Sequence, residues 1–223
     1  MSHMNPTPKH KMGMPTVFVA LALLSANVAH AEPKRHVPYK QAAIFGSVFT
    51  WTYALATGAP LTQCKPTGTH MRVEYGEDAE LSVKTVGLYT HNCLIKQYDT
   101  WRLSHTPMLN LTHWAGDSTS ENSRSTFDIA AIPMLRWEKT FGFMPYPVDF
   151  ELGVGFSYLN DVNIGTREKS TKFQFTDHSG IGFSSPNRDW RVGFAFRHLS
   201  NLGLKLPNNG ANFFGASFEM KFD

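Results

Sequence analysis

A histidine and a serine two residues apart, His198 and Ser200, are the residues of this chain best suited to do chemistry. They follow Phe194 and Phe196 in a run where apolar residues alternate with small or charged ones, so a β-strand would place all four on one face. An imidazole beside a hydroxyl is the base and nucleophile pair of acyl transfer. The motif is short, and the alternative interpretation is two polar residues in the aqueous rim beyond a membrane. The elements around the pair must decide between the two.

Alternation with period two extends over much of the chain. No sustained helical period and no repeat at solenoid spacing is present, so the pattern predicts an all-β protein. One strand with unclear limits is expected between residues 70 and 89. The other expected strands are residues 42–53, 99–114, 126–137, 150–158, 173–183, 190–197 and 214–222.

A soluble β-sandwich and a membrane β-barrel both alternate, and three features favour the barrel. One stripe is rich in Phe, Trp, Val and Met, while the opposite stripe holds Gly, Arg, Ser and Glu, as for a lipid-facing exterior and a polar interior. The strands are about ten residues or longer, which suffices to cross a bilayer. Long polar connections (115–125, 160–171 and 200–211) alternate with an intermediate one (138–147) and a short one (184–189). We predict an eight-stranded antiparallel transmembrane β-barrel.

The composition and the absence of certain motifs exclude several other classes of protein. The 223 residues carry 21 Lys and Arg against 18 Asp and Glu, a net charge of +3 that does not support nucleic-acid binding. After residue 31 no run of about eighteen apolar residues occurs, which excludes a helical membrane protein. The histidines, among them His105, His113 and His178, show no metal spacing, and no nucleotide fingerprint is present. We therefore expect no metal and no cofactor.

The N-terminal segment has the features of an export signal. Two lysines precede a short apolar core over residues 17–24, and an Ala-His-Ala sequence fits cleavage after Ala31. We expect residues 1–31 to be a signal peptide and residues 32–223 to form the barrel; a transmembrane anchor is the alternative. Export agrees with the two cysteines, Cys64 and Cys93, which we expect to form one structural disulfide.

The His-Ser pair is part of a longer motif. Residues 196–212 read Phe-Arg-His-Leu-Ser-Asn-Leu-Gly-Leu-Lys-Leu-Pro-Asn-Asn-Gly-Ala-Asn. This segment closely resembles the signature His-x-Ser-Asn-x-Gly-x-Lys-x-Pro-Asn-x-Gly of outer-membrane lipid A 3-O-deacylases, the PagL-like family, and every fixed position is present. The resemblance extends more loosely over residues 99–223 and fades over residues 32–98.

The resemblance implies an outer-membrane barrel that cleaves the ester of the 3-hydroxyacyl chain at position 3 of lipid A. Ser200 would be the nucleophile and His198 the general base. Asn208, with Asn201 or a backbone N–H near Gly203, resembles the oxyanion donors, and an ordinary turn residue is the alternative for each. Lipid A in the outer leaflet and the membrane lipid are the implied partners, no cofactor is implied, and a homodimer is left open.

One position departs from the family. The orienting acid, a Glu twelve residues after the serine, is Asn212 here. An amide can orient an imidazole, but it cannot stabilise the imidazolium by charge. Folding the chain back about the turn near residues 187–188 places Asp177 opposite His198, on the same face of the sheet. We expect Asp177 to supply the missing charge or to share the role with Asn212; the alternative is a rim residue without a catalytic part.

Two other functions stay open from the residues alone. One is a non-catalytic small barrel that acts in adhesion or membrane integrity, and the other is a barrel phospholipase or acyltransferase. Arg167 and Lys169, in the connection before the strand at 173–183, are interpreted as solvated loop charge, with contact to lipid A phosphates as the alternative.

Overall fold

The computed structural model describes residues 66–78, 81–116 and 125–222. Most of them are in β-strands, as predicted for an all-β protein. Within these ranges no helix is long and apolar enough to cross a membrane. The strands are β1 (Pro66–Asp78), β2 (Leu81–His91), β3 (Cys93–Gln97), β4 (Trp101–Gly116), β5 (Thr126–Phe141), β6 (Met144–Leu159), β7 (Asn163–Ile164), β8 (Arg167–Glu168), β9 (Phe173–Ser184), β10 (Trp190–Ser200) and β11 (Ala211–Phe222).

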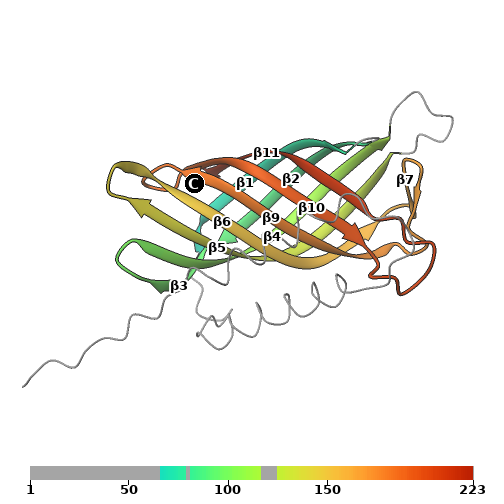
Figure 1. Ribbon diagram of the computed structural model, residues 1–223, viewed down its shortest axis with the longest axis horizontal. Helices are drawn as coiled ribbons and strands as arrows, with labels where there is room; N and C mark the ends of the chain where they lie inside the picture. Colours follow the sequence, from blue (N-terminus) through green and yellow to red (C-terminus); the bar gives the residue numbers. More distant parts are fainter. Residues whose placement is uncertain (1–65, 79–80, 117–124, 223) are drawn as a thin grey trace, which may run out of the picture. The chain divides into compact units, whose positions relative to one another are not determined.

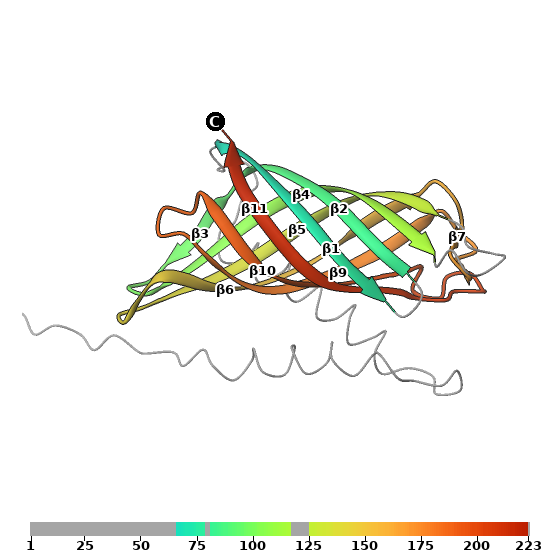
Figure 2. The same cartoon turned by 90° about the horizontal axis from the view of Figure 1, so that it is seen from above.

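The long strands form one closed antiparallel sheet (Figure 1). Neighbouring strands pair in the order β4-β5-β6-β9-β10-β11-β1-β2, and β2 returns to pair with β4. The short strand β3 pairs with the first part of β4, and β2 pairs with the last part. Together β2 and β3 therefore form one of the eight strands of the barrel. The predicted eight-stranded antiparallel barrel is confirmed. Figure 2 shows the strands running at a slant to the barrel axis, as closure of a sheet requires.

Two details of the strand assignment differ from the expectation. The stretch over residues 70–89, in which one strand is expected, contains most of β1 and β2. The connection expected over residues 138–147 is a turn of only two residues, because β5 continues to Phe141 and β6 begins at Met144. Pro145 and Pro147 lie inside β6, but its pairing with β9 begins only at Val148, so the missing N–H groups interrupt no bond to that strand.

Two expectations cannot be compared with the structure. The strand expected over residues 42–53 lies outside the described residues, and so does the predicted signal peptide over residues 1–31. The barrel is complete with strands that begin at residue 66.

The two faces of the sheet differ in polarity as predicted. Large apolar side chains at every second position point outward and are well exposed, a pattern that suits lipid rather than water. Examples from six strands are Leu109, Ile129, Phe156, Ile181, Phe194 and Phe214. The alternate positions point inward and carry most of the buried Arg, Glu and Asp side chains.

Buried ion pairs fill the interior of the barrel. Arg136 contacts Glu151 at 3.1 Å and Glu219 at 2.9 Å, and Arg72 lies within 3.4 Å of Glu219 and also pairs with Glu151. Each charge in this network has an opposite partner, which is the condition for keeping ionised groups away from water. Glu219 therefore belongs to the ion-pair network inside the barrel, and the sheet separates it from His198 on the outside.

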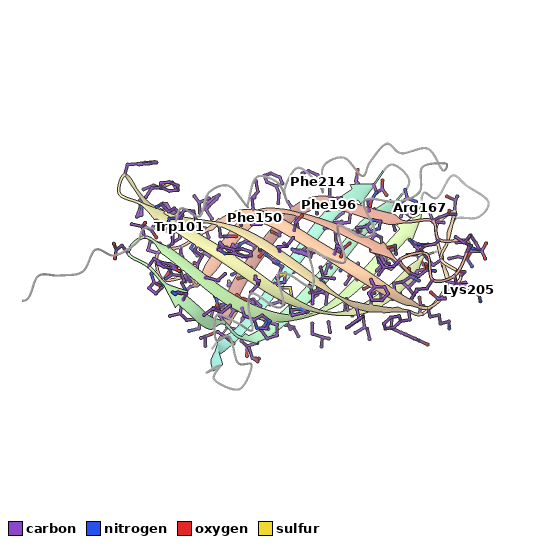
Figure 3. All side chains as sticks on the ribbon, turned by 60° about the horizontal axis from the view of Figure 1, so that its bottom comes forward. Trp101, Phe150, Arg167, Phe196, Lys205 and Phe214 are labelled. Carbon is purple, nitrogen blue, oxygen red and sulfur yellow. The ribbon has the colours of Figure 1, made fainter. Side chains whose placement is uncertain are left out.

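The connections at the two ends of the barrel differ in length. Apart from residues 79–80, those at the end where β10 reaches Ser200 are long: 117–125, 160–172 and 201–210. Those at the other end are short: 98–100, 142–143 and 185–189. Figure 3 shows Arg167 and Lys205 at the first end and Trp101 at the second. Outer-membrane barrels carry their long loops on the outside, so His198 and Ser200 lie near the outer end.

A cluster of buried apolar residues anchors the strands at this outer end. It includes Trp114, Leu199, Ala211 and Phe213, each with 1% exposure or less. Leu199 and Ala211 are paired with each other across β10 and β11, and their burial holds these two strand ends in place. Because successive residues of a strand point to opposite faces, the neighbours of this inward pair point outward.

Candidate active site

His198 and Asn212 face each other across the β10–β11 pair on the outer side of the barrel. A hydrogen bond of 2.7 Å joins His198 Nδ1 to Asn212 Oδ1. An amide oxygen only accepts, so Nδ1 carries a proton, and in the neutral ring Nε2 is then the basic nitrogen. This is the tautomer that a general base needs.

Ser200 is the last residue of β10 and shares the parity of His198. Residues two apart on a strand have Cα atoms about 6.5–7 Å apart, so side-chain rotation can bring Oγ toward Nε2. In the described residues Ser200 Oγ has one hydrogen bond, a long one of 3.5 Å from the N–H of Leu202. Ser200 Oγ and His198 are thus not hydrogen-bonded to each other in this structure.

A tight turn held by Asn201 follows the serine. Leu202 and Gly203 have φ values of 55° and 73°, in the left-handed region. Asn201 Oδ1 accepts the N–H of Gly203 at 2.8 Å, and Asn201 Nδ2 donates to the carbonyls of Lys169 at 3.0 Å and Lys205 at 2.8 Å. Both the Asn201 amide and the Gly203 N–H are therefore engaged in holding the loop.

Asn208 has a different arrangement. Its Oδ1 accepts the backbone N–H of Asn201 at 3.0 Å, which brings residue 208 next to the residue that follows Ser200. Its Nδ2 has no acceptor within the described part of the chain. An amide N–H group without a partner, on a residue that contacts the neighbour of Ser200, is the kind of donor that an oxyanion requires.

Gly210 packs directly against the imidazole of His198. A Cβ atom built on this glycine would lie 2.8 Å from His198 Cε1 and 3.7 Å from both ring nitrogens. Arg167 holds the glycine in this position, because its Nη1 donates to the Gly210 carbonyl at 3.0 Å while its guanidinium pairs with Asp78. The site thus has room for the ring only when residue 210 lacks a side chain.

Gly210→Ala is expected to lower the rate of acyl-ester hydrolysis by about tenfold to a hundredfold. The His198 imidazole would have to move away from the new methyl group, and a shift of a reacting group by about 1 Å lowers the rate by up to about a hundredfold. Initial rates with the purified barrel measure this. Gly142→Ala is the matched control, since a Cβ at that glycine meets nothing within 4 Å. Equal rates for Gly210→Ala and wild type would contradict the packing argument.

Asp177 of β9 lies directly opposite His198, on the side away from Asn212. The register predicted from the short turn near residues 187–188 is therefore confirmed. In the described residues Asp177 forms no ion pair, and His198 is its neighbour across the β9–β10 pair. The imidazole thus has an amide on one neighbouring strand and a carboxylate on the other.

Lys169 differs from the sequence interpretation. Instead of a solvated loop charge it is a fully buried side chain whose Nζ donates to the carbonyl of Leu199 at 2.9 Å and to that of Asn209. No local signal distinguishes Lys169 from the exposed Lys172, because its two partners are 30 and 40 residues further along the chain.

The cysteine and metal expectations bear on residues away from this site. Cys93 begins β3 and is buried, but Cys64 lies outside the described residues, so the disulfide stays a prediction. Over residues 66–78, 81–116 and 125–222, no group of three or more His, Cys, Asp or Glu side chains is placed to hold a metal ion.

The fold defines a class: a β-barrel of the outer-membrane type, which here carries His198, Asn212 and Ser200 together on its exterior. A family model described as lipid A 3-O-deacylase (PagL) matches residues 79–221. The chain belongs to the lipid A 3-O-deacylase (PagL) family.

Two known proteins are similar to this chain. The lipid A deacylase PagL of Bordetella bronchiseptica (strain ATCC BAA-588 / NCTC 13252 / RB50) is 29% identical over 191 residues, which cover 82% of this chain and 97% of that protein. A solved structure described as the crystal structure of the outer membrane enzyme PagL superposes with a TM-score of 0.57 at 21% identity, covering 69% of this chain and 99% of the other. The second likeness supports the barrel fold.

Proposed function

We propose that this protein is an outer-membrane enzyme that removes the 3-hydroxyacyl chain from position 3 of lipid A by ester hydrolysis. The observation that carries the proposal is the hydrogen bond between His198 and Asn212 on the lipid-facing side of the barrel, with Ser200 two residues further on. The long loops at this end of the barrel support a site at the outer leaflet. Lipid A is the substrate that membership of the family supports.

The first half of the reaction transfers the acyl group to the protein. Ser200 Oγ attacks the ester carbonyl carbon while its proton passes to His198 Nε2, and the carbonyl oxygen becomes an oxyanion. Asn208 Nδ2 donates a hydrogen bond to this oxygen. The bond to the sugar oxygen then breaks, His198 returns the proton to that oxygen, and deacylated lipid A leaves as an alcohol.

The second half releases the acyl group. His198 Nε2 takes a proton from water as the water oxygen attacks the acyl-serine carbonyl. When the second tetrahedral intermediate collapses, the bond to Ser200 Oγ breaks and the serine regains a proton from His198. The products are a free 3-hydroxy fatty acid and the unmodified protein, and no cofactor enters either step.

Asp177 supplies charge that Asn212 lacks. At the outward positions of the described barrel strands, Asp177 and Glu77 are the only acidic residues, and Glu77 is at the rim, one residue from the end of β1. Asp177 is the fifth residue of β9, between the outward-facing Phe175 and Ser179. An ionisable group on a lipid-facing surface is costly and points to a functional partner. The cross-strand neighbour that gains a positive charge during the reaction is His198.

Mass spectrometry of lipid A tests the proposed function. Cells that express the protein are compared with cells that carry an empty vector and with cells that express Ser200→Ala. We expect lipid A from the first culture to lose the mass of one 3-hydroxyacyl group, with the free 3-hydroxy acid recovered, and lipid A from the other two cultures to be unchanged.

Each rival function has its own outcome in the same experiment. Unchanged lipid A in all three cultures would favour the non-catalytic barrel. Loss of acyl chains from phospholipids would favour a phospholipase, and a gain of acyl mass on lipid A would favour an acyltransferase. Any of these results would contradict the deacylase. The sequence leaves a homodimer open, and sedimentation of the purified barrel in detergent tests it.

A further inference from the structure

Lys169 is a buried cation close to the reacting groups that the mechanism above does not use. It follows the small β7–β8 hairpin in the connection between β6 and β9, and the whole residue has 0% exposure. Its backbone is held on both sides: the N–H donates to Val162 at 2.8 Å and the carbonyl accepts from Asn201 Nδ2 at 3.0 Å. A lysine is almost never fully buried unless its ammonium has dedicated partners.

The ammonium joins two segments of the site that are ten residues apart. Nζ donates to the carbonyl of Leu199, the residue before Ser200, at 2.9 Å. It also donates to the carbonyl of Asn209, the residue after Asn208. The N–H of Asn209 is in turn held by the Glu168 carbonyl at 3.1 Å. One side chain therefore connects the end of β10 with the loop that carries the oxyanion donor.

The partners of this lysine are neutral. No salt bridge to Lys169 forms within the described ranges; its direct partners are two backbone carbonyls, and the Asp78 carboxylate acts on it from further away. Burial lowers the pKa of Lys169 to about 7, the nearby Arg167 lowers it as well, and Asp78 raises it. The other charged residues on these two connections are Asp161, which is half-buried and accepts the N–H of Asn163 at 2.8 Å, and the exposed Glu168, Lys172 and Lys205. The proton on Nζ is thus lost within the neutral range, where the hydrogen bonds to the two carbonyls weaken.

We propose that Lys169 is a positioning residue for the deacylation reaction, whose ammonium sets the separation between the nucleophile Ser200 and the oxyanion donor Asn208. The inference rests on the proposed function. Oxyanion donors act only when they are held in place before the reaction, and a donor moved by about 1 Å loses up to about a hundredfold in rate. Lys169 has no hydrogen bond to Ser200 Oγ and acts through the two backbone carbonyls that it holds, so we expect its loss to lower kcat rather than to raise KM.

The test compares Lys169→Met, Lys169→Arg and wild type on purified lipid A in detergent micelles, with kcat and KM measured from pH 5.5 to pH 9. Lys169→Met keeps the length of the side chain but cannot donate, and we expect its kcat to fall by about tenfold to a hundredfold with KM little changed. Lys172→Met is the matched control: the same substitution three residues away on an exposed lysine should leave both constants unchanged.

The pH profile separates positioning from a merely structural role. Wild-type kcat should decline as the pH rises through about 7, where Lys169 loses its proton. Lys169→Arg stays charged throughout, so it should retain more kcat than Lys169→Met and should not show this decline. The compact, heat-modifiable form of the barrel on a gel shows whether each variant is folded. If Lys169→Met does not fold, the comparison of the Lys169→Arg pH profile with the wild-type profile still tests the positioning role.

Three results would overturn the proposal. They are a folded Lys169→Met with wild-type kcat, a loss confined to KM, and a Lys169→Arg profile that superposes on that of wild type. Failure of wild type to deacylate lipid A at any pH would instead refute the proposed function, so the two failures are distinguishable.

Discussion

Ser200→Ala should lose deacylation by at least about a thousandfold while the barrel stays folded. The hydroxyl is the group that bonds to the acyl carbon, and removal of a catalytic serine costs about a millionfold in a well-studied serine protease. Ser200 is at the end of β10 and accepts only one weak hydrogen bond in the described residues, so the fold should not depend on it. The release of 3-hydroxy fatty acid from lipid A micelles measures the loss.

His198→Ala should give a loss of the same order, and the double variant should be little worse than either single one, because the two groups act as a unit. Ser179→Ala is the control, since Ser179 is a lipid-facing serine on the neighbouring strand and is paired with Phe196 away from the imidazole. Near-native turnover in Ser200→Ala would show that another group attacks the ester, and the mechanism would have to be abandoned.

Asp177→Asn should lower kcat by about tenfold to a hundredfold. In the proposed mechanism, the imidazolium that forms is hydrogen-bonded to a neutral amide, and the carboxylate on the opposite strand is the nearby charge that would stabilise it. A unit charge at about 4 Å contributes at most about 4 kcal/mol at an effective dielectric constant of about 20, and a longer separation reduces this. Steady-state rates on lipid A give the effect, and Glu77→Gln removes the same charge from the same face as a control.

Asn212→Glu is the complementary variant, and we expect it to raise kcat by about tenfold, because the carboxylate would adjoin His198 Nδ1 directly. In that background Asp177→Asn should matter less than it does in wild type, since the two carboxylates act on the same charge. Unchanged turnover in Asp177→Asn, together with a large gain in Asn212→Glu, would refute the role of Asp177. The protein would then work with an amide alone.

The sequence by itself determined the barrel and the faces of its strands. Alternation is a local property: once residues 190–197 form a strand, His198 and Ser200 must share the outward side with Phe194 and Phe196. The short turn near residues 187–188 likewise determined the partner of His198, because a hairpin with few loop residues leaves one register. Asp177 was therefore placed correctly from sequence. The limits of β5 and β6 were not predicted correctly. A proline interrupts a strand only where its missing N–H would bond to a neighbouring strand, and Pro145 and Pro147 precede the part of β6 that pairs with β9.

Only the tertiary structure decided how the groups around the serine are used. From the sequence, Asn208 is the first candidate for an oxyanion donor, with Asn201 or a backbone N–H near Gly203 beside it. In the fold, Asn201 and the Gly203 N–H hold the loop, and Asn208 Nδ2 has no partner in the described residues. Lys169 and Gly210 carry no local signal at all. Their roles depend on contacts between connections that are far apart in the chain, and such contacts are set by closure of the barrel rather than by the period of any one strand.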